Sequence, residues 1–549
     1  MRCRYLSIVT AALLLAGCHP ASPEPVVTPE PDPVVTPEPG PVQVPETAFV
    51  YEIHPDRELG SISPLIYGIN VLKGTSHTEK DVSTLVRLGG NRLTGYNWEN
   101  NASNAGSDWY HHSDGYLVSS VVEGSRLDEP GSVAETFVRN CLSHGQTPLV
   151  TVPICYRVAA DMDGTVAEGD DSRWVANLPR KEGPLSATPD LGDGAVYADE
   201  MVHFLAEVKG FKGKVAYSLD NEPDLWHYTH PRICPEHISC QEFLDRTLAF
   251  ASAIKDVDPD ARVQGFASFG YSGFTTFCDA PDWPQVREEG GYSWFIDYFL
   301  DRIARAGAEA GRPLVDVLDL HWYPEAKGDH RVTQGDANTM KDRLARLQAP
   351  RSLWDPSYKE VSWITQSSGY RLPLLPEVRA SIDRYAPGTK LSISEFAYGG
   401  GEDITGAIAL SEVLGIFGQY GIWSAAHWGD PGPYGWLAYR IFRNYDGEGS
   451  CYGDTLVESA LSEQSPEHSS VFASTDAAGA LHIIVTNKKA GEDIDAYFKI
   501  DGGKPFSSGT MYRILVGKAD LDGPEELTVQ DGNCLVRLPA LSVSHLVFR

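Results

Sequence analysis

The sequence has little positive charge. Lys and Arg number 45 against 75 Asp and Glu, which gives a formal net charge of −30 at pH 7. A chain this acidic repels nucleic acid and anionic glycans, so we expect no nucleic-acid partner. A neutral polysaccharide would meet no such repulsion.

Long apolar runs are missing except near the N-terminus. Ser7–Leu15 is too short to cross a bilayer, and it follows two arginines, as the core of an export signal does. It runs into Leu15-Ala16-Gly17-Cys18, which has the form of a bacterial lipobox. We therefore expect residues 1–17 to be removed and Cys18 to carry lipid. The protein would then be exported and anchored to the periplasmic or cell-surface face of a bacterial membrane; the alternative is an ordinary signal peptide with an incidental Cys18.

Cysteines are few, and their spacing matches no zinc pattern, so we expect no metal at the site. With Cys3 in the leader and Cys18 lipidated, seven remain: Cys141, Cys155, Cys234, Cys240, Cys278, Cys451 and Cys534. An odd number leaves at least one thiol unpaired or bonded to another chain. Cys234 and Cys240 are close enough in one loop to pair, and an oxidising compartment would allow it.

Residues 18–46 lack the apolar side chains needed for a core. They repeat Val-Thr-Pro-Glu at 27–30 and 35–38, which predicts an extended, negatively charged linker. The roughly 500 residues that follow suffice for one large catalytic domain and one smaller domain.

Eight short apolar runs alternate with amphipathic segments through the middle of the chain. The expected strands are Leu65–Asn70, Val86–Leu93, Pro148–Ile154, Val215–Leu219, Arg262–Ala267, Val315–Leu320, Leu391–Ser394 and Ile422–Ala426. The expected helices include Ala198–Val208, Cys240–Ile254, Trp294–Ala306 and Gly406–Phe417. Eight β-then-α units predict an α/β fold, a (β/α)8 barrel over residues 64–447. A doubly wound open sheet is less favoured because no Gly-rich phosphate loop follows the first strand.

The C-terminal segment has a different pattern. Short strands with Gly- and Asp-rich turns predict a β-sandwich over residues 448–549. These strands are Ser470–Ala473, Leu481–Thr486, Asp495–Ile500, Thr510–Val516 and Leu535–Leu538. Phe49–Ile53 also alternates like a strand, so residues 47–63 are expected to join the sandwich from the other end of the chain.

Two glutamates stand at the ends of expected strands. Glu222 follows the fourth strand and Glu395 follows the seventh. The strand ends of a barrel share one rim, where catalytic groups gather. Hydrolysis of a glycosidic bond with retention uses two carboxyl groups roughly 5–5.5 Å apart, one as acid/base and one as nucleophile. The rival carboxylates Glu99 and Glu325 end no strand, so we interpret them as structural.

Five sequence blocks carry a likeness to a known family: 86–114, YSLDNEPDLWHYTHP (217–231), DLHWYPEA (319–326), RSLWDPSYKEVSWI (351–364) and 393–418. On these blocks the chain resembles glycoside hydrolase family 44, a family of endo-β-1,4-glucanases and xyloglucanases, over residues 50–450. The resemblance implies a barrel-plus-sandwich fold and a retaining mechanism, with Glu222 as acid/base and Glu395 as nucleophile. The family often has Tyr and Asn after the nucleophile, where this chain has Phe396 and Ala397. Some members bind a structural calcium ion, whose ligands are not assigned here; no cofactor is required.

Several polar and aromatic residues near these strand ends are expected to bind substrate. The Asn221 amide would bond a sugar hydroxyl near the reacting carbon, and Trp428 would stack on the sugar at the cleavage point. Tyr323 and His321 would reach the nucleophile side, where the tyrosine hydroxyl could bond the carboxylate. Further candidates, each of which could instead be structural, are Trp98, Trp226 and Trp322 as sugar platforms and Asn91 and Arg92 as hydroxyl contacts.

Together these patterns and the family resemblance predict a monomeric, retaining, endo-acting hydrolase of neutral β-1,4-glucan, acting on cellulose-type glucan, on xyloglucan or on both. One alternative is a surface glycan-binding lipoprotein on an inactive barrel, which the presence of both carboxylates disfavours. A second is a retaining hydrolase of another backbone, such as xylan or mannan, because the catalytic pair does not select the sugar. A third, an adhesion lipoprotein without a glycan substrate, is disfavoured by the polar residues clustered at the strand ends.

Overall fold

The computed structural model describes residues 43–70, 82–122, 126, 129–462 and 466–549. The expected leader, the lipobox with Cys18 and nearly all of the expected linker lie outside these residues. The part from Gln43 to Arg549 forms one compact unit. Among the described residues, no helix combines the length and the apolarity that a bilayer crossing requires.

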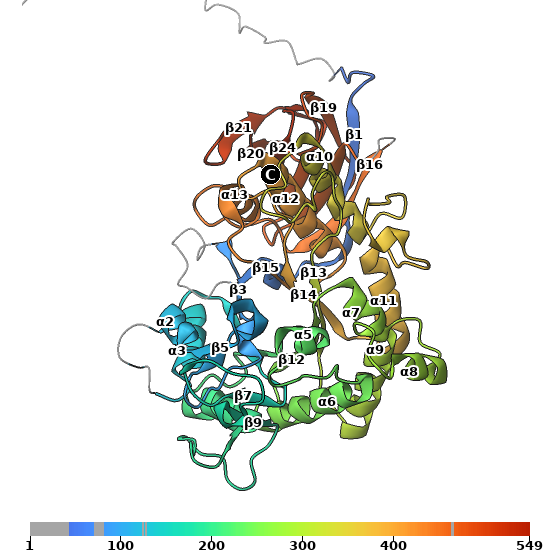
Figure 1. Cartoon of the computed structure of the whole chain (residues 1–549). Helices are drawn as coiled ribbons and strands as arrows, with labels where there is room; N and C mark the ends of the chain where they lie inside the picture. The colour runs from blue at the N-terminus through green and yellow to red at the C-terminus, as the bar shows by residue number, and fades with distance from the viewer. Residues whose placement is uncertain (1–42, 71–81, 123–125, 127–128, 463–465) are drawn as a thin grey trace, which may run out of the picture. The chain divides into compact units, whose positions relative to one another are not determined.

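Eight parallel strands close into a barrel whose order around the ring follows the order of the chain (Figure 1). They are β2 (Gly68–Asn70), β3 (Leu85–Leu88), β6 (Thr147–Val152), β11 (Ala216–Leu219), β12 (Arg262–Ser268), β13 (Val317–Trp322), β14 (Lys390–Phe396) and β15 (Ser424–Trp428). Each expected strand overlaps one of these, so the predicted (β/α)8 barrel is confirmed. The strands β13 and β14 extend two residues beyond their expected ends. Glu395 is therefore the second-to-last residue of β14 and does not follow the strand.

Helices cover the barrel, and most of them are amphipathic. The main ones are α3 (Ser132–Ser143), α4 (Ala198–His203), α6 (Cys240–Val257), α9 (Phe295–Ala310), α11 (Leu374–Tyr385), α12 (Ile404–Gln419) and α13 (Gly432–Arg443), and the shorter ones are α2 (Tyr116–Val121), α5 (Trp226–Thr229), α7 (Tyr271–Thr276), α8 (Trp283–Gly290) and α10 (Met340–Gln348). In α6, Ser239 caps the first turn by accepting a hydrogen bond from the Glu242 amide at 3.1 Å. Phe243, Phe250 and Ile254 of α6 recur at helical spacing and are buried.

Helix α12 is buried on almost every side. It packs against α13 and also against three strands of the C-terminal sheet, which explains why its sequence is apolar all round. Gly415 meets Phe472 of that sheet so closely that a Cβ would lie 2.4 Å from the ring. The helix that follows the Glu395 strand is therefore fixed by the second domain.

The C-terminal domain is a ten-stranded, mostly antiparallel sheet that encloses its own apolar core. Its strands are β1 (Phe49–Ser61), β16 (Thr455–Ser462), β17 (Ser469–Thr475), β18 (Leu481–Asn487), β19 (Ile494–Ile500), β20 (Gly509–Ile514), β21 (Asp522–Leu527), β22 (Val529–Gln530), β23 (Asn533–Leu538) and β24 (Ser542–Phe548). β1 lies between β16, to which it is antiparallel, and β19, to which it is parallel. The expected N-terminal strand thus joins the sandwich.

The loops after β3 and β6 contain two small sheets. One contains β4 (Ser103–Asn104), β5 (His112–Asp114) and β8 (Gly164–Thr165), and the other contains β7 (Arg157–Ala159), β9 (Trp174–Leu178) and β10 (Ala195–Tyr197). β5 pairs with β8, which joins the loop after β3 to the loop after β6. All seven cysteines of the described residues carry free thiols, so Cys234 and Cys240 are not paired in this structure.

Candidate active site

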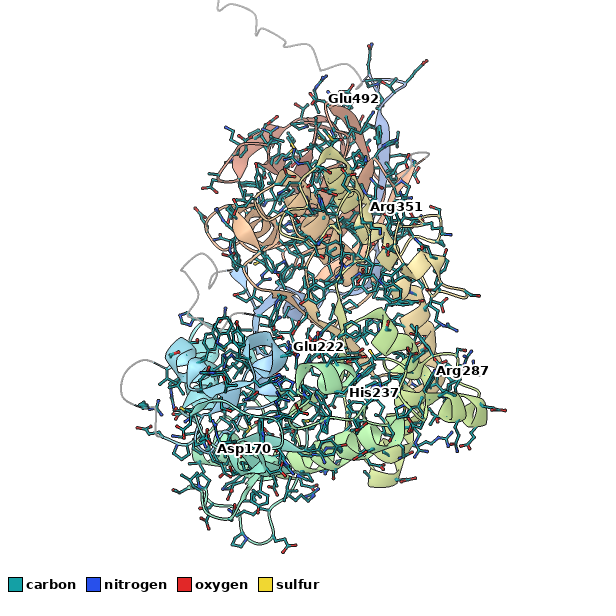
Figure 2. All side chains as sticks on the ribbon, viewed as in Figure 1. Asp170, Glu222, His237, Arg287, Arg351 and Glu492 are labelled. Atoms are coloured by element: carbon teal, nitrogen blue, oxygen red, sulfur yellow. The ribbon has the colours of Figure 1, made fainter. Side chains whose placement is uncertain are left out.

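Glu222 lies in a tight turn directly after β11, beside α5 near the centre of the view in Figures 1 and 2. Its backbone is left-handed, with φ 46° and ψ 55°, a conformation that costs free energy in a residue other than glycine. Asp220 holds this turn, because its buried carboxylate accepts hydrogen bonds from the Ile154 and Cys155 amides and from the Trp226 indole. The strained turn is thereby fixed by the segment after β6 and by α5.

Glu395 of β14 is buried and carries two strong partners. Arg87 of β3 donates from Nη1 to Oε1 at 2.6 Å, and the Tyr323 hydroxyl donates to Oε2 at 2.8 Å. The hydrogen bond expected from Tyr323 is therefore present. The guanidinium stabilises a negative charge on this carboxylate.

Arg87 also links the nucleophile candidate to the turn that carries Glu222. Its Nη2 donates to Oδ1 of Asn221 at 2.9 Å, and the Gly90 amide donates to the same oxygen at 3.2 Å. The Asn221 amide nitrogen donates in turn to Oδ1 of Asn91 at 3.1 Å. These contacts fix the orientation of the Asn221 amide at the rim.

His321 lies between the two glutamates. Its Nδ1 is 2.9 Å from Oε1 of Glu222 and 3.5 Å from Oε2 of Glu395. Burial lowers the pKa of His321 to about 4, against the opposing effect of the Glu395 charge. The ring is therefore neutral at neutral pH, and it orients Glu222 without adding a charge.

The two carboxyl groups are close and chemically different. An oxygen of Glu222 and an oxygen of Glu395 lie within 4.8 Å of each other and of a His321 nitrogen. Burial raises the pKa of Glu222 to about 7; the Arg87 charge opposes this shift and the Asp108 charge adds to it. Burial and the Glu395 charge raise the pKa of the Tyr323 hydroxyl, which therefore keeps its proton as a donor. The site thus combines a carboxyl group poised to hold a proton with one paired to a guanidinium.

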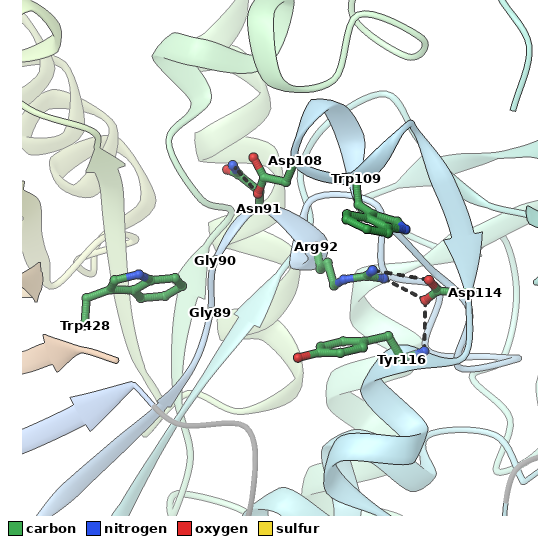
Figure 3. A pocket seen from close by; sticks show the side chains of 10 residues that line it. Gly89, Gly90, Asn91, Arg92, Asp108, Trp109, Asp114, Tyr116 and Trp428 are labelled. Atoms are coloured by element: carbon green, nitrogen blue, oxygen red, sulfur yellow. Dashed lines mark hydrogen bonds and ion pairs between the residues drawn. The ribbon is translucent and has the colours of Figure 1, made fainter. Parts of the chain in front are cut away.

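Four tryptophans were expected to bind sugar rings, and of these Trp428 alone has an exposed ring. It is 43% exposed, and a Cβ on Gly90 would lie 2.6 Å from its ring, so the indole lies directly over the backbone at Gly90. Figure 3 shows Trp428 beside Gly89 and Gly90. This position is adjacent to Asn221, which Gly90 contacts.

Three expected platforms require correction. Trp98, Trp226 and Trp322 are at most 2% exposed, so none offers a ring face to a sugar. Trp98 packs on Phe204, and the Trp226 indole donates to Asp220. Trp322 ends β13, and Trp98 and Trp226 follow β3 and β11, yet all three side chains are buried.

The remaining candidates hold structural partners. Arg92 pairs with Asp114 at 2.6 Å, and the Asn91 amide nitrogen donates to Asp108 at 2.9 Å. Glu325 pairs with Arg331 at 2.9 Å, and Glu99 is buried near the charges of Asp193 and Glu200.

Sequence reasoning missed Arg87. It stands inside a buried strand, in the run Leu85-Val86-Arg87-Leu88, where its side chain is fully buried. A charged residue within an apolar strand is rarely buried without a partner, and that signal could have marked it.

Among the described residues, one set of at least three His, Cys, Asp or Glu side chains could meet at a metal, namely Glu222, His321 and Glu395. This set does not fit a calcium ion, which prefers six to eight oxygen ligands. Arg87 and Tyr323 already occupy both oxygens of Glu395.

Comparisons with known proteins find extensive similarity. The glycoside hydrolase family 44 profile matches residues 102–326. Endoglucanase A of Paenibacillus lautus is 43% identical over 514 residues, which cover 91% of this chain and 72% of that protein. A family 44 xyloglucanase from Paenibacillus polymyxa superposes with a TM-score of 0.87 at 39% identity, covering 91% of this chain and 99% of that one. A family 44 endoglucanase from Clostridium thermocellum gives 0.87 at 41% identity, covering 91% and 100%.

Proposed function

The chain belongs to glycoside hydrolase family 44, and on that premise we propose that it is a retaining endo-β-1,4-glucanase acting on neutral glucan. The observation that carries the proposal is the pair Glu222 and Glu395, with oxygens within 4.8 Å of each other. Retaining enzymes hold their carboxyl groups roughly 5–5.5 Å apart, whereas inverting enzymes need roughly 6.5–9.5 Å to admit a water molecule. The narrow spacing favours double displacement.

In the first step, Glu222 gives its proton to the glycosidic oxygen while a Glu395 oxygen attacks the anomeric carbon. The bond to the leaving sugar breaks, and an ester bond to Glu395 forms in its place. Arg87 and Tyr323 orient the attacking carboxylate. The raised pKa of Glu222 supports its role as the acid, because a carboxyl group with an ordinary pKa would have lost its proton at neutral pH.

In the second step, Glu222 is a carboxylate and takes a proton from water. The water oxygen attacks the anomeric carbon, the ester to Glu395 breaks, and both glutamates return to their starting states. Two inversions give net retention. The Asn221 amide is held where it can bond a hydroxyl of the reacting sugar, a contact that strengthens in the transition state. Because the two carboxyl groups supply acid, base and nucleophile, the reaction needs no cofactor.

Two substrates are supported by the relatives. The similar proteins are named as endoglucanases and as a xyloglucanase, so we include both unsubstituted glucan and xyloglucan in the proposal. The strong negative charge of the chain supports a neutral polymer over an anionic one.

A slow fluorinated glycoside tests the assignment of the nucleophile. The wild type should accumulate a glycosyl ester that peptide mass spectrometry maps to Glu395, whereas Glu395→Gln should form no adduct. Glu222→Gln should lose most activity on natural glucan without unfolding. An adduct on any other residue, or no sugar released from glucan, xyloglucan or lichenan by the wild type, would contradict the proposal.

We also propose that the protein is exported and held to a membrane through lipid on Cys18, on the strength of the lipobox sequence alone. Detergent phase partition of the protein made in a bacterial host, with labelled fatty acid, tests this. The wild type should enter the detergent phase with label, and Cys18→Ser should stay in the aqueous phase without it. Unlabelled wild type would contradict the anchor.

A further inference from the structure

Two buried cysteines meet beneath the turn that carries Glu222. Cys155 lies between β6 and β7, Cys234 lies between α5 and α6, and their side chains are 0% and 1% exposed. The two thiols share a side-chain hydrogen bond, so residues far apart in the sequence bring their sulfur atoms together. The Cys234 thiol donates its own proton to the Glu236 carbonyl oxygen at 3.2 Å, which leaves its sulfur free to accept from Cys155.

The segment around Cys155 is fixed against Cys234 by further contacts. The Cys155 amide donates to Asp220 at 3.0 Å, and the hydroxyl of the next residue, Tyr156, donates to Glu242 at 2.7 Å. Burial and Glu242 raise the pKa of the Tyr156 hydroxyl, and the Cys234 thiol adds to that rise. Cys234 therefore faces both residues of this segment.

Cys240, the partner that sequence spacing predicts for Cys234, faces a different group. Its amide donates to Asp282 at 2.7 Å. Burial raises the pKa of the Cys240 thiol, and the same Asp282 carboxylate adds to that rise as a hydrogen-bond partner. The side chains of the folded chain therefore favour Cys155 over Cys240 as the neighbour of Cys234.

The buried thiols react poorly once the core has closed. Burial raises the pKa of Cys155, the neighbouring Cys234 thiol and the Asp220 charge add to that rise, and the thiolate is the form that attacks a disulfide. An oxidant must therefore reach the pair while the chain is still folding. Protein or low-molecular-weight disulfides are such oxidants in compartments outside the cytoplasm.

We propose that Cys155 and Cys234 form a disulfide bond when the chain folds in an oxidising compartment; the structure shows its reduced form. The Cys155 thiolate attacks one sulfur of the oxidant disulfide and releases a first thiolate. The Cys234 thiolate then attacks the Cys155 sulfur and releases the second. Both cysteine protons pass to the released thiolates, so the two cysteines lose two electrons and the oxidant is reduced to two thiols.

The bond would tie together the two segments that hold the turn of Glu222. The Cys155 amide and the Trp226 indole donate to Asp220 from these segments, one after β6 and one in α5. The bond would close a loop of about 80 residues, and a cross-link of that span stabilises a fold by restricting the unfolded chain. The inference goes beyond the proposed hydrolysis and depends on the proposed export only for the place where the oxidant is met.

Peptide mapping without reduction tests the bond. The full chain is made in the periplasm of a bacterial host, blocked with N-ethylmaleimide in denaturant and digested with trypsin. Trypsin places Cys155 in the peptide 140–157 and Cys234 in the peptide 233–246. We expect mass spectrometry to find these two peptides joined, with Cys141 and Cys240 carrying the blocking group.

Variants identify the partners, because each peptide contains a second cysteine. Cys155→Ala and Cys234→Ala should each abolish the joined peptide. Cys141→Ala and Cys240→Ala are the matched controls and should keep it. A peptide 233–246 that is unblocked and lighter by two hydrogens would show a bond between Cys234 and Cys240 and would overturn the proposal.

Thermal unfolding with and without a phosphine reductant measures what the bond contributes. The wild type should melt about 2–5 °C lower with the reductant, since the unfolded chain is then no longer cross-linked. The double variant Cys155→Ala with Cys234→Ala should melt at one temperature in both conditions. Blocked Cys155 and Cys234 in the folded wild type, or a wild type whose melting ignores the reductant, would also overturn the proposal. None of these measurements uses glucan cleavage, so they do not depend on the outcome for the proposed function.

Discussion

Glu222 and Glu395 are the same amino acid in two environments, and the difference lies in their partners. Glu395 is bonded to a guanidinium and a hydroxyl, whereas the partner of Glu222 is the neutral ring of His321. Glu395 is held by an ion pair and a hydroxyl group, whereas burial raises the pKa of Glu222 and favours its protonated form. The side chains that contact each glutamate therefore distinguish the acid from the nucleophile.

Tyr323→Phe removes one hydrogen bond from the proposed nucleophile without changing the shape of the side chain. We expect kcat to fall by about 10- to 100-fold, because a hydroxyl bonded to a carboxylate contributes about 1.5–3 kcal/mol. The melting temperature should stay close to that of the wild type. Steady-state kinetics measures the change in kcat, and thermal unfolding is the control for stability. An unchanged kcat would show that the hydroxyl does not orient the carboxylate.

The pKa of Glu222, about 7, predicts the basic side of the pH profile. The acid must be protonated to act, so kcat/KM should fall as pH rises through about 7. Asp108 raises this pKa through its charge, so Asp108→Asn should move the basic limb to lower pH. Because Asp108 is exposed, the shift should shrink in high salt. A limb that does not move at low salt contradicts this coupling.

At the scale of elements, one buried ion pair joins the two domains. Lys488, which follows β18 of the sandwich, donates to both carboxylate oxygens of Glu412 of α12 at 3.1 Å, and neither side chain is exposed. Both partners are desolvated, so each depends on the other. The pair fixes α12 against the sandwich, and α12 directly follows the strand and loop of Glu395.

Lys488→Met should destabilise the protein by about 3–5 kcal/mol, since it leaves the Glu412 charge buried and unpaired. The double variant Lys488→Met with Glu412→Leu should recover most of that loss, because two apolar residues replace both charges. Denaturant unfolding of the two single variants and the double variant measures the difference. A double variant no more stable than Lys488→Met alone would contradict this account.

The sequence predicted the elements well and the contacts poorly. The barrel strands could be predicted because buried parallel strands appear as continuous apolar runs, and Glu222 and Glu395 because they stand where such runs end. Strand β21 was missed, since Asp522-Gly523-Pro524-Glu525-Glu526 has the composition of a turn and forms a strand only at the sheet edge. Trp226 was misplaced because sequence position at a rim does not say whether a side chain points into the cleft or beneath it.

At the scale of the whole molecule, the fold buries acidic groups at positions where a negative charge lowers the stability of the protein. Burial, with the Asp193 and Glu200 charges, raises the pKa of Glu99 to about 8. A carboxyl group whose pKa is raised by folding stabilises the fold while it is protonated, and that stability is lost as pH rises from about 4.5 toward 8. The fold should therefore gain from neutralising Glu99 at high pH.

Glu99→Gln should raise stability by an amount that grows with pH, small at pH 5 and on the order of 2 kcal/mol at pH 8. Melting curves at both pH values, recorded with a chelator so that no divalent cation neutralises the carboxylates, test this. A gain at pH 5 equal to that at pH 8 would contradict the linkage. Added calcium that stabilises the wild type alone would indicate that Glu99 is neutralised by a cation instead.

Strand β1 has a consequence for how the protein is made. It is an interior strand of the sheet, yet its neighbours β16 and β19 are synthesised about 400 and 430 residues later. A growing chain must therefore keep β1 unpaired until translation is almost complete, and the apolar surface of α12 stays uncovered until β17, β18 and β24 have been made. Fragments that stop before Thr455 would carry both surfaces bare and should aggregate, so the barrel is not a module that can be cut free of its C-terminal partner.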